Sequence, residues 1–193
     1  RTRLPFALKA LCDLNNINFS FELIDTALID DFDFIRCVEE RIASGWTGVT
    51  VTHPYKTAAA DFVGTLTNAP SNMGASNTLI FNGSISSGDV TAYNTDYTGF
   101  VAAWDAVLGM RKPGKVAMAG AGGVSRAIAI AIIENGAEQL AIWDLQLERA
   151  QAVARIADPT GVRAFAISMD QSNTYVQAAN GLVNATALGM IQY

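Results

Sequence analysis

Cysteine, histidine and clustered basic residues are scarce in this sequence of 193 residues. It has two cysteines, Cys12 and Cys37, and a single histidine, His53. Neither cysteine has another Cys or a His at metal-ligand spacing, so we expect free thiols in a reducing compartment and no metal. The thirteen Lys and Arg residues are scattered and are outnumbered by eighteen Asp and Glu residues, which gives a net charge of −5. Nucleic acids and anionic membranes attract clustered positive charge, so neither is an expected partner.

Long hydrophobic runs are also absent. No apolar stretch is long enough to span a bilayer, and the first residues lack the basic-then-apolar pattern of a signal sequence. We therefore predict a cytoplasmic location. Half of the residues are hydrophobic, which is enough for one large domain or two small ones. The sequence starts without a methionine and stops just past a predicted strand, so we expect it to be part of a longer protein.

The first half alternates helical and extended patterns, judged from apolar periodicity and from capping and turn residues. Helices are predicted over 3–16, 30–45, from Pro54 onward and over 95–109, and strands over 17–25, 47–52, 75–81 and 89–94. The helix over 30–45 has acidic residues in its first turn and closes on Gly45. The helix over 95–109 has Thr95 or Asp96 near its cap.

A composition shift at "MRKPGK", residues 110–115, marks a linker between domains. Beyond it the pattern predicts helices around 125–135 and over 147–157, and strands over 116–119, 139–144, 161–167 and 181–186. Strands that alternate with helices predict a parallel, doubly wound sheet. The expected fold is α/β, with an N-terminal substrate domain over 1–110 and a Rossmann-type dinucleotide-binding domain over 111–193 whose C-terminal part is missing.

The stretch "AGAGGVSRA" lies between a predicted strand and a predicted helix, and predicts a dinucleotide-binding loop. Glycine lets the backbone approach a pyrophosphate, whose charge the helix N-terminus favours. The expected cofactor-binding residues of this loop are Gly120, Ala121, Gly122, Gly123 and Val124, and Ser125 takes the place of the third glycine. The alternative is a purely structural glycine turn.

Asp144 ends the next strand, where a carboxylate accepts hydrogen bonds from the adenosine ribose and repels a 2′-phosphate. This favours NAD over NADP. The alternative is an aspartate that caps the following helix. Arg149 keeps NADP possible, because a guanidinium there is within range of a phosphate.

Three polar clusters lie at the carboxyl ends of strands in the first half, where open α/β sheets bind ligands. They are Thr50, Thr52 and Lys56; Ser76 and Asn77; and Asn94, Thr95 and Asp96. Taken singly, these are ordinary residues: a solvated lysine, a turn-forming asparagine, an N-cap aspartate. Together, beside a dinucleotide-binding pattern, they predict one substrate pocket.

The motifs "TVTHPYK", "GASNTL", "NTDYTGF", "GAGGVSRA" and "VNATALGM" occur in this order over essentially the whole chain. In this the sequence resembles the shikimate/quinate dehydrogenase family. The "THPYK" form and the acidic "WDLQLER" stretch are more similar to the NAD-preferring quinate/shikimate branch than to the NADP-using enzymes.

The resemblance implies hydride transfer between a nicotinamide cofactor and a ring hydroxyl of shikimate or quinate, by a monomer or homodimer. It implies that Lys56 and Asp96 are the catalytic acid–base pair. It assigns substrate contacts to Thr2, Thr52 and Asn77, and to Thr50, which replaces the family's usual asparagine. It assigns the loop beside the nicotinamide to Thr186, Ala187 and Met190.

Three alternatives remain open. His53 is a candidate general base because it carries an imidazole, but strand alternation turns it away from Thr50 and Thr52, so we interpret it as a local structural residue. Another two-domain dehydrogenase, of the methylenetetrahydrofolate or amino-acid type, conflicts with the ordered "THPYK" and "NTD" motifs. A non-catalytic sensor of quinate or shikimate conflicts with the presence of both Lys56 and Asp96.

Overall fold

The computed structural model describes residues 3–82 and 90–189. The chain divides into two compact units, Arg1–Asp33 and Phe34–Tyr193. Among the described residues, no helix is long and apolar enough to cross a membrane. The predicted domain boundary near residue 110 falls inside the second unit, between α4 (Thr95–Leu108) and β4 (Lys115–Ala119), and remains a prediction.

The first unit holds the helix α1 (Leu4–Leu14) and the short 3-10 helix η1 (Thr26–Leu28). The predicted helix over 3–16 is confirmed, with Pro5 in its first turn, where a missing N–H breaks no helical bond. The predicted strand over 17–25 is wrong: this stretch pairs with no described strand. Period-two alternation describes extended backbone, but a strand also requires hydrogen bonds to a neighbour.

The second unit begins with α2 (Phe34–Ala43), β1 (Gly48–Thr50) and α3 (Lys56–Val63). Two predicted helix starts were too early. Asp31 has a φ of +51°, which a right-handed helix excludes, so α2 starts at Phe34 and not at residue 30. The Tyr55 amide closes a turn onto the Thr52 carbonyl at 3.0 Å, so α3 starts at Lys56 and not at Pro54, which follows a cis peptide bond.

The strands β1, β2 (Thr78–Phe81) and β3 (Val90–Tyr93) form an antiparallel sheet in the order β1-β2-β3. The prediction of parallel pairing therefore does not hold for this part. Helices α2 and α3 pack on the sheet through Val38, Ile42, Ala59, Ala60, Leu79 and Ala92. The 3-10 helix η2 (Ser71–Met73) lies in the connection from α3 to β2.

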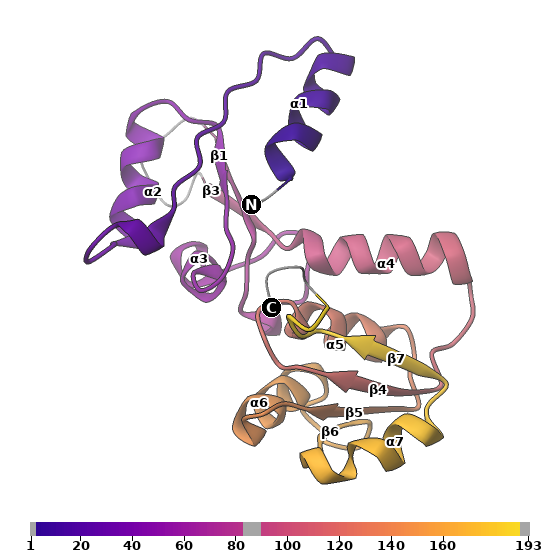
Figure 1. Ribbon diagram of the computed structural model, residues 1–193. Coiled ribbons are helices and arrows are strands. Elements are labelled where there is room, and N and C mark those ends of the chain that lie inside the picture. The colour runs from indigo at the N-terminus through magenta and orange to yellow at the C-terminus, as the bar shows by residue number, and fades with distance from the viewer. Residues whose placement is uncertain (1–2, 83–89, 190–193) are drawn as a thin grey trace. The chain divides into compact units, whose positions relative to one another are not determined.

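The second sheet is parallel, as predicted, with β4, β5 (Gln139–Trp143), β6 (Ala164–Ala166) and β7 (Gly181–Asn184) in the order β6-β5-β4-β7. The helices α5 (Ser125–Glu134), α6 (Leu147–Ala157) and α7 (Ser172–Ala178) alternate with these strands, and the 3-10 helix η4 (Met169–Gln171) precedes α7 (Figure 1). Strand order reverses between β4 and β7, which is the position where Rossmann-type sheets bind a dinucleotide.

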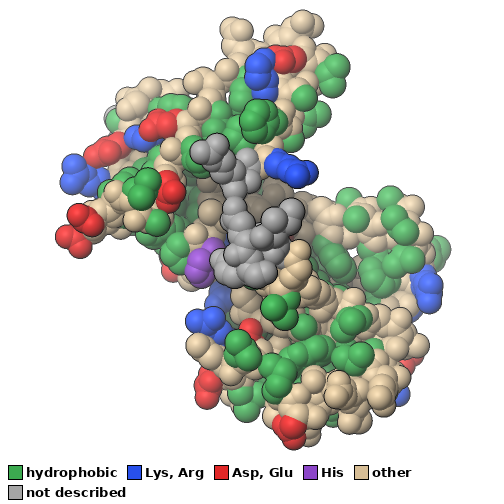
Figure 2. Space-filling model, viewed as in Figure 1, with side chains coloured by type: hydrophobic (Ala, Val, Ile, Leu, Met, Phe, Trp, Pro, Cys, Tyr) green, Lys and Arg blue, Asp and Glu red, His purple; other side chains and the backbone are tan. Residues whose placement is uncertain are grey.

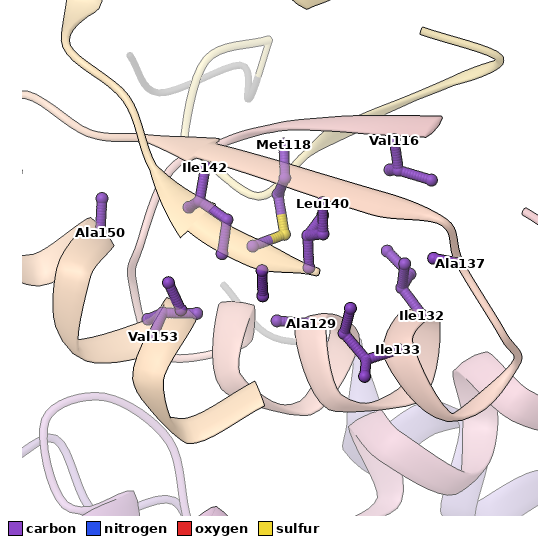
Figure 3. Packing of buried hydrophobic residues seen from close by; sticks show 12 residues of the cluster. Val116, Met118, Ala129, Ile132, Ile133, Ala137, Leu140, Ile142, Ala150 and Val153 are labelled. Atoms are coloured by element: carbon purple, nitrogen blue, oxygen red, sulfur yellow. The ribbon is translucent and has the colours of Figure 1, made fainter. Parts of the chain in front are cut away.

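The core of this sheet lies between its strands and the helices α5 and α6. Met118, Leu140 and Ile142 point from the strands toward the side of the sheet that these helices cover (Figure 3). Ala129, Ile132, Ala150 and Val153 are among the residues that the helices contribute to the cluster. The small alanines let α5 and α6 approach the sheet and each other closely.

Candidate active site

Antiparallel pairing brings the three polar clusters to one edge of the first sheet. Beyond the paired strands, the Val51 amide donates to the Asn77 carbonyl at 2.8 Å, and the Asn77 amide donates to the Tyr93 carbonyl at 3.1 Å. Ser76 and Asn77 precede β2, so they lie at its amino end and not, as predicted, at a carboxyl end. They meet the other clusters because β2 runs opposite to β1 and β3.

Lys56 and Asp96 form an ion pair at this edge. Lys56 Nζ lies 2.6 Å from Asp96 Oδ2, and the two side chains keep only 15% and 28% of their accessible surface. Lys56 opens α3 and Asp96 lies in the first turn of α4. The positive end of a helix dipole stabilises the carboxylate and opposes the ammonium charge. The carboxylate partner therefore offsets an unfavourable position of the lysine.

Asn94 leaves the Asp96 side chain available for this pair. The prediction put Thr95 or Asp96 near the helix cap, and the N-cap itself is Asn94, whose Oδ1 accepts from the amides of Asp96 and Tyr97, both at 3.1 Å. Asn94 Nδ2 donates to the Ala75 carbonyl at 2.8 Å, and the residue is 1% exposed. A buried side chain with its polar atoms satisfied holds one geometry.

Asn77 is joined to the same helix start. Its Nδ2 donates to Thr95 Oγ1 at 2.9 Å, and its Oδ1 accepts from the Thr95 amide at 2.9 Å. Thr50 and Thr52 are exposed on either side of the buried Val51, as strand alternation predicts. These hydroxyl and amide groups can exchange hydrogen bonds with a polyhydroxylated ligand.

His53 lies in the turn before α3 and is exposed (Figure 2, purple). Basic and acidic side chains are interspersed on the face of the molecule in Figure 2. The part of the chain that the structure describes contains no group of His, Cys, Asp or Glu side chains arranged to hold a metal ion.

The glycine loop lies at the reversal of strand order. Gly120 has a φ of +94°, and a Cβ on it would lie 2.8 Å from the Ala185 carbonyl and from Thr186 Cγ2. Only glycine fits there, because the loop after β4 packs against the loop after β7. Gly122 and Gly123 are exposed with open space around them, directly before α5. The buried Ser125 Oγ donates to the Gly120 carbonyl at 3.0 Å and fixes the loop.

Asp144 contacts both the glycine loop and the next helix. Its Oδ2 accepts from the Ala121 amide at 2.8 Å, and its Oδ1 accepts from the Gln146 amide at 3.0 Å, just before α6. A carboxylate has further lone pairs, so these bonds leave it able to accept from ribose hydroxyls. Arg149 lies exposed in the first turns of α6.

These features fit a dinucleotide. Such a cofactor contacts three kinds of group: backbone without Cβ atoms, the N-terminus of a helix, and a carboxylate at the end of the next strand. The glycine loop, the start of α5 and Asp144 at the end of β5 provide them. Val124 is the residue before α5, and the open space at Gly122 and Gly123 would leave room for a pyrophosphate.

The loop after β7 is ordered by Asn184, which the sequence analysis did not single out. Its Oδ1 accepts from Thr186 Oγ1 at 2.6 Å and from the Thr186 amide at 3.0 Å. Ala187 is exposed in this loop. Thr2 and Met190, two further predicted site residues, lie outside the described residues.

The capping role of Asn94 and two long-range contacts were also missed, although Asn94 itself was part of a predicted polar cluster. The position of Asn94 directly before a helical pattern was a readable capping signal. The bond from Arg126 to Gly74 and the bond from Asp144 to the glycine loop join residues far apart in sequence, and no local pattern indicates them. A surface hollow of about 390 Å³ beside Trp104 and Lys112 contains none of the predicted residues.

Comparison with known proteins finds relatives of similar sequence and fold. Residues 2–79 match the shikimate dehydrogenase substrate-binding domain. A quinate/shikimate dehydrogenase (NAD⁺) of Corynebacterium glutamicum is 34% identical over 160 residues, which are 82% of this chain and 56% of that protein. This chain thus resembles the shikimate/quinate dehydrogenase family in sequence and fold.

The names of the relatives give different cofactors, NAD⁺ for some and NADP⁺ for others. A shikimate dehydrogenase (NADP⁺) of Brucella abortus is 35% identical over 176 residues, 90% of this chain and 57% of that protein. The structure of quinate dehydrogenase from C. glutamicum in complex with NAD matches with a TM-score of 0.85 at 29% identity, covering 99% of this chain and 68% of that one. The chain thus spans a little over half the length of these curated relatives.

Proposed function

We propose that this protein is a nicotinamide-dependent dehydrogenase that oxidises a ring hydroxyl of shikimate or quinate to the ketone, and catalyses the reverse reduction. The observation that supports this best is the ion pair of Lys56 and Asp96, at a sheet edge lined with hydroxyl and amide side chains. Relatives that carry the names quinate/shikimate dehydrogenase and shikimate dehydrogenase support the same reaction class.

Lys56 is the proposed proton acceptor. Lys56 must first give up a proton to solvent and react as the neutral amine. In the oxidation, the substrate O–H bond then breaks and its proton goes to Lys56 Nζ, while the carbinol C–H bond supplies a hydride. A nicotinamide cofactor, when bound, would supply the acceptor for that hydride. Asp96 holds the lysine in place and stabilises its ammonium form, which then donates the proton in the reverse reaction.

Orientation of the ring is the proposed task of the surrounding polar groups. Thr50, Thr52 and Asn77 offer hydroxyl and amide groups to the substrate hydroxyls, and Thr2 is proposed to contact its carboxylate. Asn77 is held by Thr95, so its free donor and acceptor positions are limited in direction. A fixed donor discriminates better between substrates than a mobile one.

The proposed cofactor is NAD, with NADP as the alternative. Asp144 would accept from the ribose hydroxyls and repel a 2′-phosphate, while Arg149 is the residue that would favour one. Gly120, Ala121, Gly122, Gly123 and Val124 would hold the pyrophosphate. Thr186, Ala187 and Met190 would flank the nicotinamide.

The wider expectations belong to the same proposal: a cytoplasmic enzyme, monomer or homodimer, with a substrate domain over 1–110 and a cofactor domain over 111–193. A small molecule is its proposed partner.

Initial rates with quinate and with shikimate, each with NAD⁺ and with NADP⁺, test the proposal. We expect turnover that favours NAD⁺, and the ratio of the two substrates defines the preferred one. Absence of turnover in all four combinations would contradict the proposed dehydrogenase activity. If calorimetry then still detected quinate or shikimate binding, the protein would be a sensor.

A further inference from the structure

Arg126 connects the start of the cofactor helix to the loop that carries substrate-site residues. It is the second residue of α5, directly after the glycine loop, and is half-buried. Its Nη1 donates to the Gly74 carbonyl at 3.2 Å. Gly74 has a φ of +57° and follows η2, so this carbonyl belongs to a left-handed turn. The contact joins residues 52 positions apart in the sequence.

The same turn is fixed to α5 by apolar packing. Met73 and Ala75, on either side of Gly74, are 0% and 3% exposed and pack against Ala127 and Ile130 of α5. The hydrogen bond from the Arg126 guanidinium to the Gly74 carbonyl lies among these apolar contacts. It is charge-assisted, and so stronger than a bond between neutral groups. A cation in the first turn of a helix is otherwise unfavourable, because it faces the positive end of the helix dipole.

From Gly74 the chain runs directly into the candidate active site. The Ala75 carbonyl accepts from Asn94 Nδ2 at 2.8 Å, and the Ser76 amide donates to the Lys56 carbonyl at 2.8 Å. Asn77 then holds the start of α4, which carries Asp96. A shift of Gly74 therefore reaches the backbone of Lys56 and the helix of Asp96 through consecutive hydrogen bonds.

We propose that Arg126 is a positioning residue that couples the cofactor loop to the substrate site. It holds residues 74–77 against the start of α5, so that binding at the glycine loop and binding at the substrate edge favour each other. The inference rests on the proposed function. Coupling of this kind is reciprocal: each ligand tightens the binding of the other by the same factor.

Hydrogen exchange of the ligand-free protein tests the mechanical link. In Arg126→Met, which keeps the length of the side chain and removes its donors, we expect the Ser76 and Asn77 amides to exchange about tenfold faster, because a charge-assisted hydrogen bond is lost. Arg126→Lys keeps the charge and should restore part of the protection. Arg155→Met, an exposed arginine of α6, is the matched control and should leave both amides unchanged.

Binding of NADH with and without saturating shikimate, a pair that cannot react, tests the coupling. We expect shikimate to tighten NADH binding in the wild type, and the tightening to fall about fivefold or more in Arg126→Met, within the usual range of coupling between sites. Equal coupling in wild type and Arg126→Met, or none in the wild type, would overturn the inference.

The two proposals fail in different ways. Unchanged amide exchange in an Arg126→Met protein with normal turnover would overturn the role of Arg126 and leave the dehydrogenase intact. If the amides exchange faster in Arg126→Met but the wild type turns over none of the four substrate and cofactor combinations, the result would support the mechanical link and contradict the proposed function.

Discussion

Lys56 Nζ and Asp96 Oδ2 lie 2.6 Å apart, although forty positions separate the two residues in the sequence. Each residue lies at the start of a helix, and both helices follow strands of the same antiparallel sheet. The pairing of β1 with β2 and of β2 with β3 brings these helix starts together. The sheet therefore fixes how far apart the backbones of the two proposed acid–base residues lie. Their flexible side chains span only the remaining distance.

If this pair acts in proton transfer, Lys56→Met lowers kcat by about 10²–10⁴, the usual contribution of general acid–base catalysis. Asp96→Asn lowers it through the lost charge partner. The double variant should be little slower than Lys56→Met, because residues that act as a unit are not additive. Initial rates at saturating substrate give the comparison.

The chain offers a matched control for that experiment. Lys9 and Asp13 form an ion pair at 2.7 Å whose side chains are 63% and 60% exposed. Lys9→Met should leave kcat unchanged. A kcat of Lys56→Met within threefold of the wild type would rule out the proposed base.

Asp144→Asn should shift the cofactor preference. The variant loses the negative charge that repels a 2′-phosphate and weakens the acceptor for ribose hydroxyls. We expect the ratio of kcat/KM with NAD⁺ to kcat/KM with NADP⁺ to fall about tenfold, the scale of one hydrogen bond to a charged group. Asp105→Asn, an exposed aspartate of α4, controls for the change in net charge.

Asp144 also accepts from the Ala121 amide, so the same variant should lose some thermal stability without any ligand. A preference that stays with NAD⁺ while the melting temperature falls would show that Asp144 only braces the loop.

Local sequence patterns predicted the parallel sheet well. A strand, a glycine turn and an apolar helix follow each other within one short stretch, and the crossover that joins parallel strands leaves a single common handedness. The left-handed turn at Gly120 is what the motif predicts, whereas its close contact with Ala185 and Thr186 depends on the loop after β7. This part of the fold and the position of the glycine loop were accessible from the residues alone.

The first sheet was harder to predict from the sequence, because alternation of polar and apolar residues does not indicate whether strands pair in parallel or antiparallel. The stretch 17–25 has the same period-two pattern as a paired strand, and it joins neither of the two sheets of the described residues. Contacts such as Arg126 with Gly74 depend on the packing of α5 against η2, which follows only from the complete fold. Lys56 and Asp96 were already part of the predicted polar clusters, but their role as an acid–base pair came from family resemblance.

Gly120 and Gly122 should respond differently to a methyl group. Gly120→Ala places a Cβ 2.8 Å from Ala185 and Thr186 in a left-handed turn, so we expect a loss of about 2–5 kcal/mol in the free energy of unfolding, from backbone strain and overpacking together. Gly122→Ala meets open space and should keep its stability but bind NAD⁺ more weakly, because the methyl group obstructs the pyrophosphate.

Chemical denaturation and NAD⁺ titration of both variants separate the two effects. Equal stability of the two variants would show that the contact of the glycine loop with the loop after β7 carries no energy. Unchanged NAD⁺ affinity in Gly122→Ala would place the pyrophosphate elsewhere.

Asp158 should make the stability of the protein sensitive to acid. The Thr160 hydroxyl donates to its carboxylate at 2.6 Å, and despite burial, which acts in the opposite direction, this bond and the amides of Arg163, Ala164 and Thr160 lower the pKa of Asp158 from 3.8 to about 2. A carboxyl group with a lower pKa in the folded state stabilises the fold above its unfolded pKa. That contribution is lost as the pH falls from about 4 to about 2.

Denaturation of the wild type and of Asp158→Asn between pH 2 and pH 7 measures this effect. The amide keeps the size of the side chain but turns one acceptor into a donor that faces backbone amides, so we expect a cost of about 1–3 kcal/mol at neutral pH. The difference between the two proteins should shrink as the wild-type carboxylate is protonated. Since Asp158 lies in the turn before β6, away from the glycine loop, NAD⁺ affinity at pH 7 should not change. A stability difference independent of pH would show that the Asp158 charge is not what holds this turn.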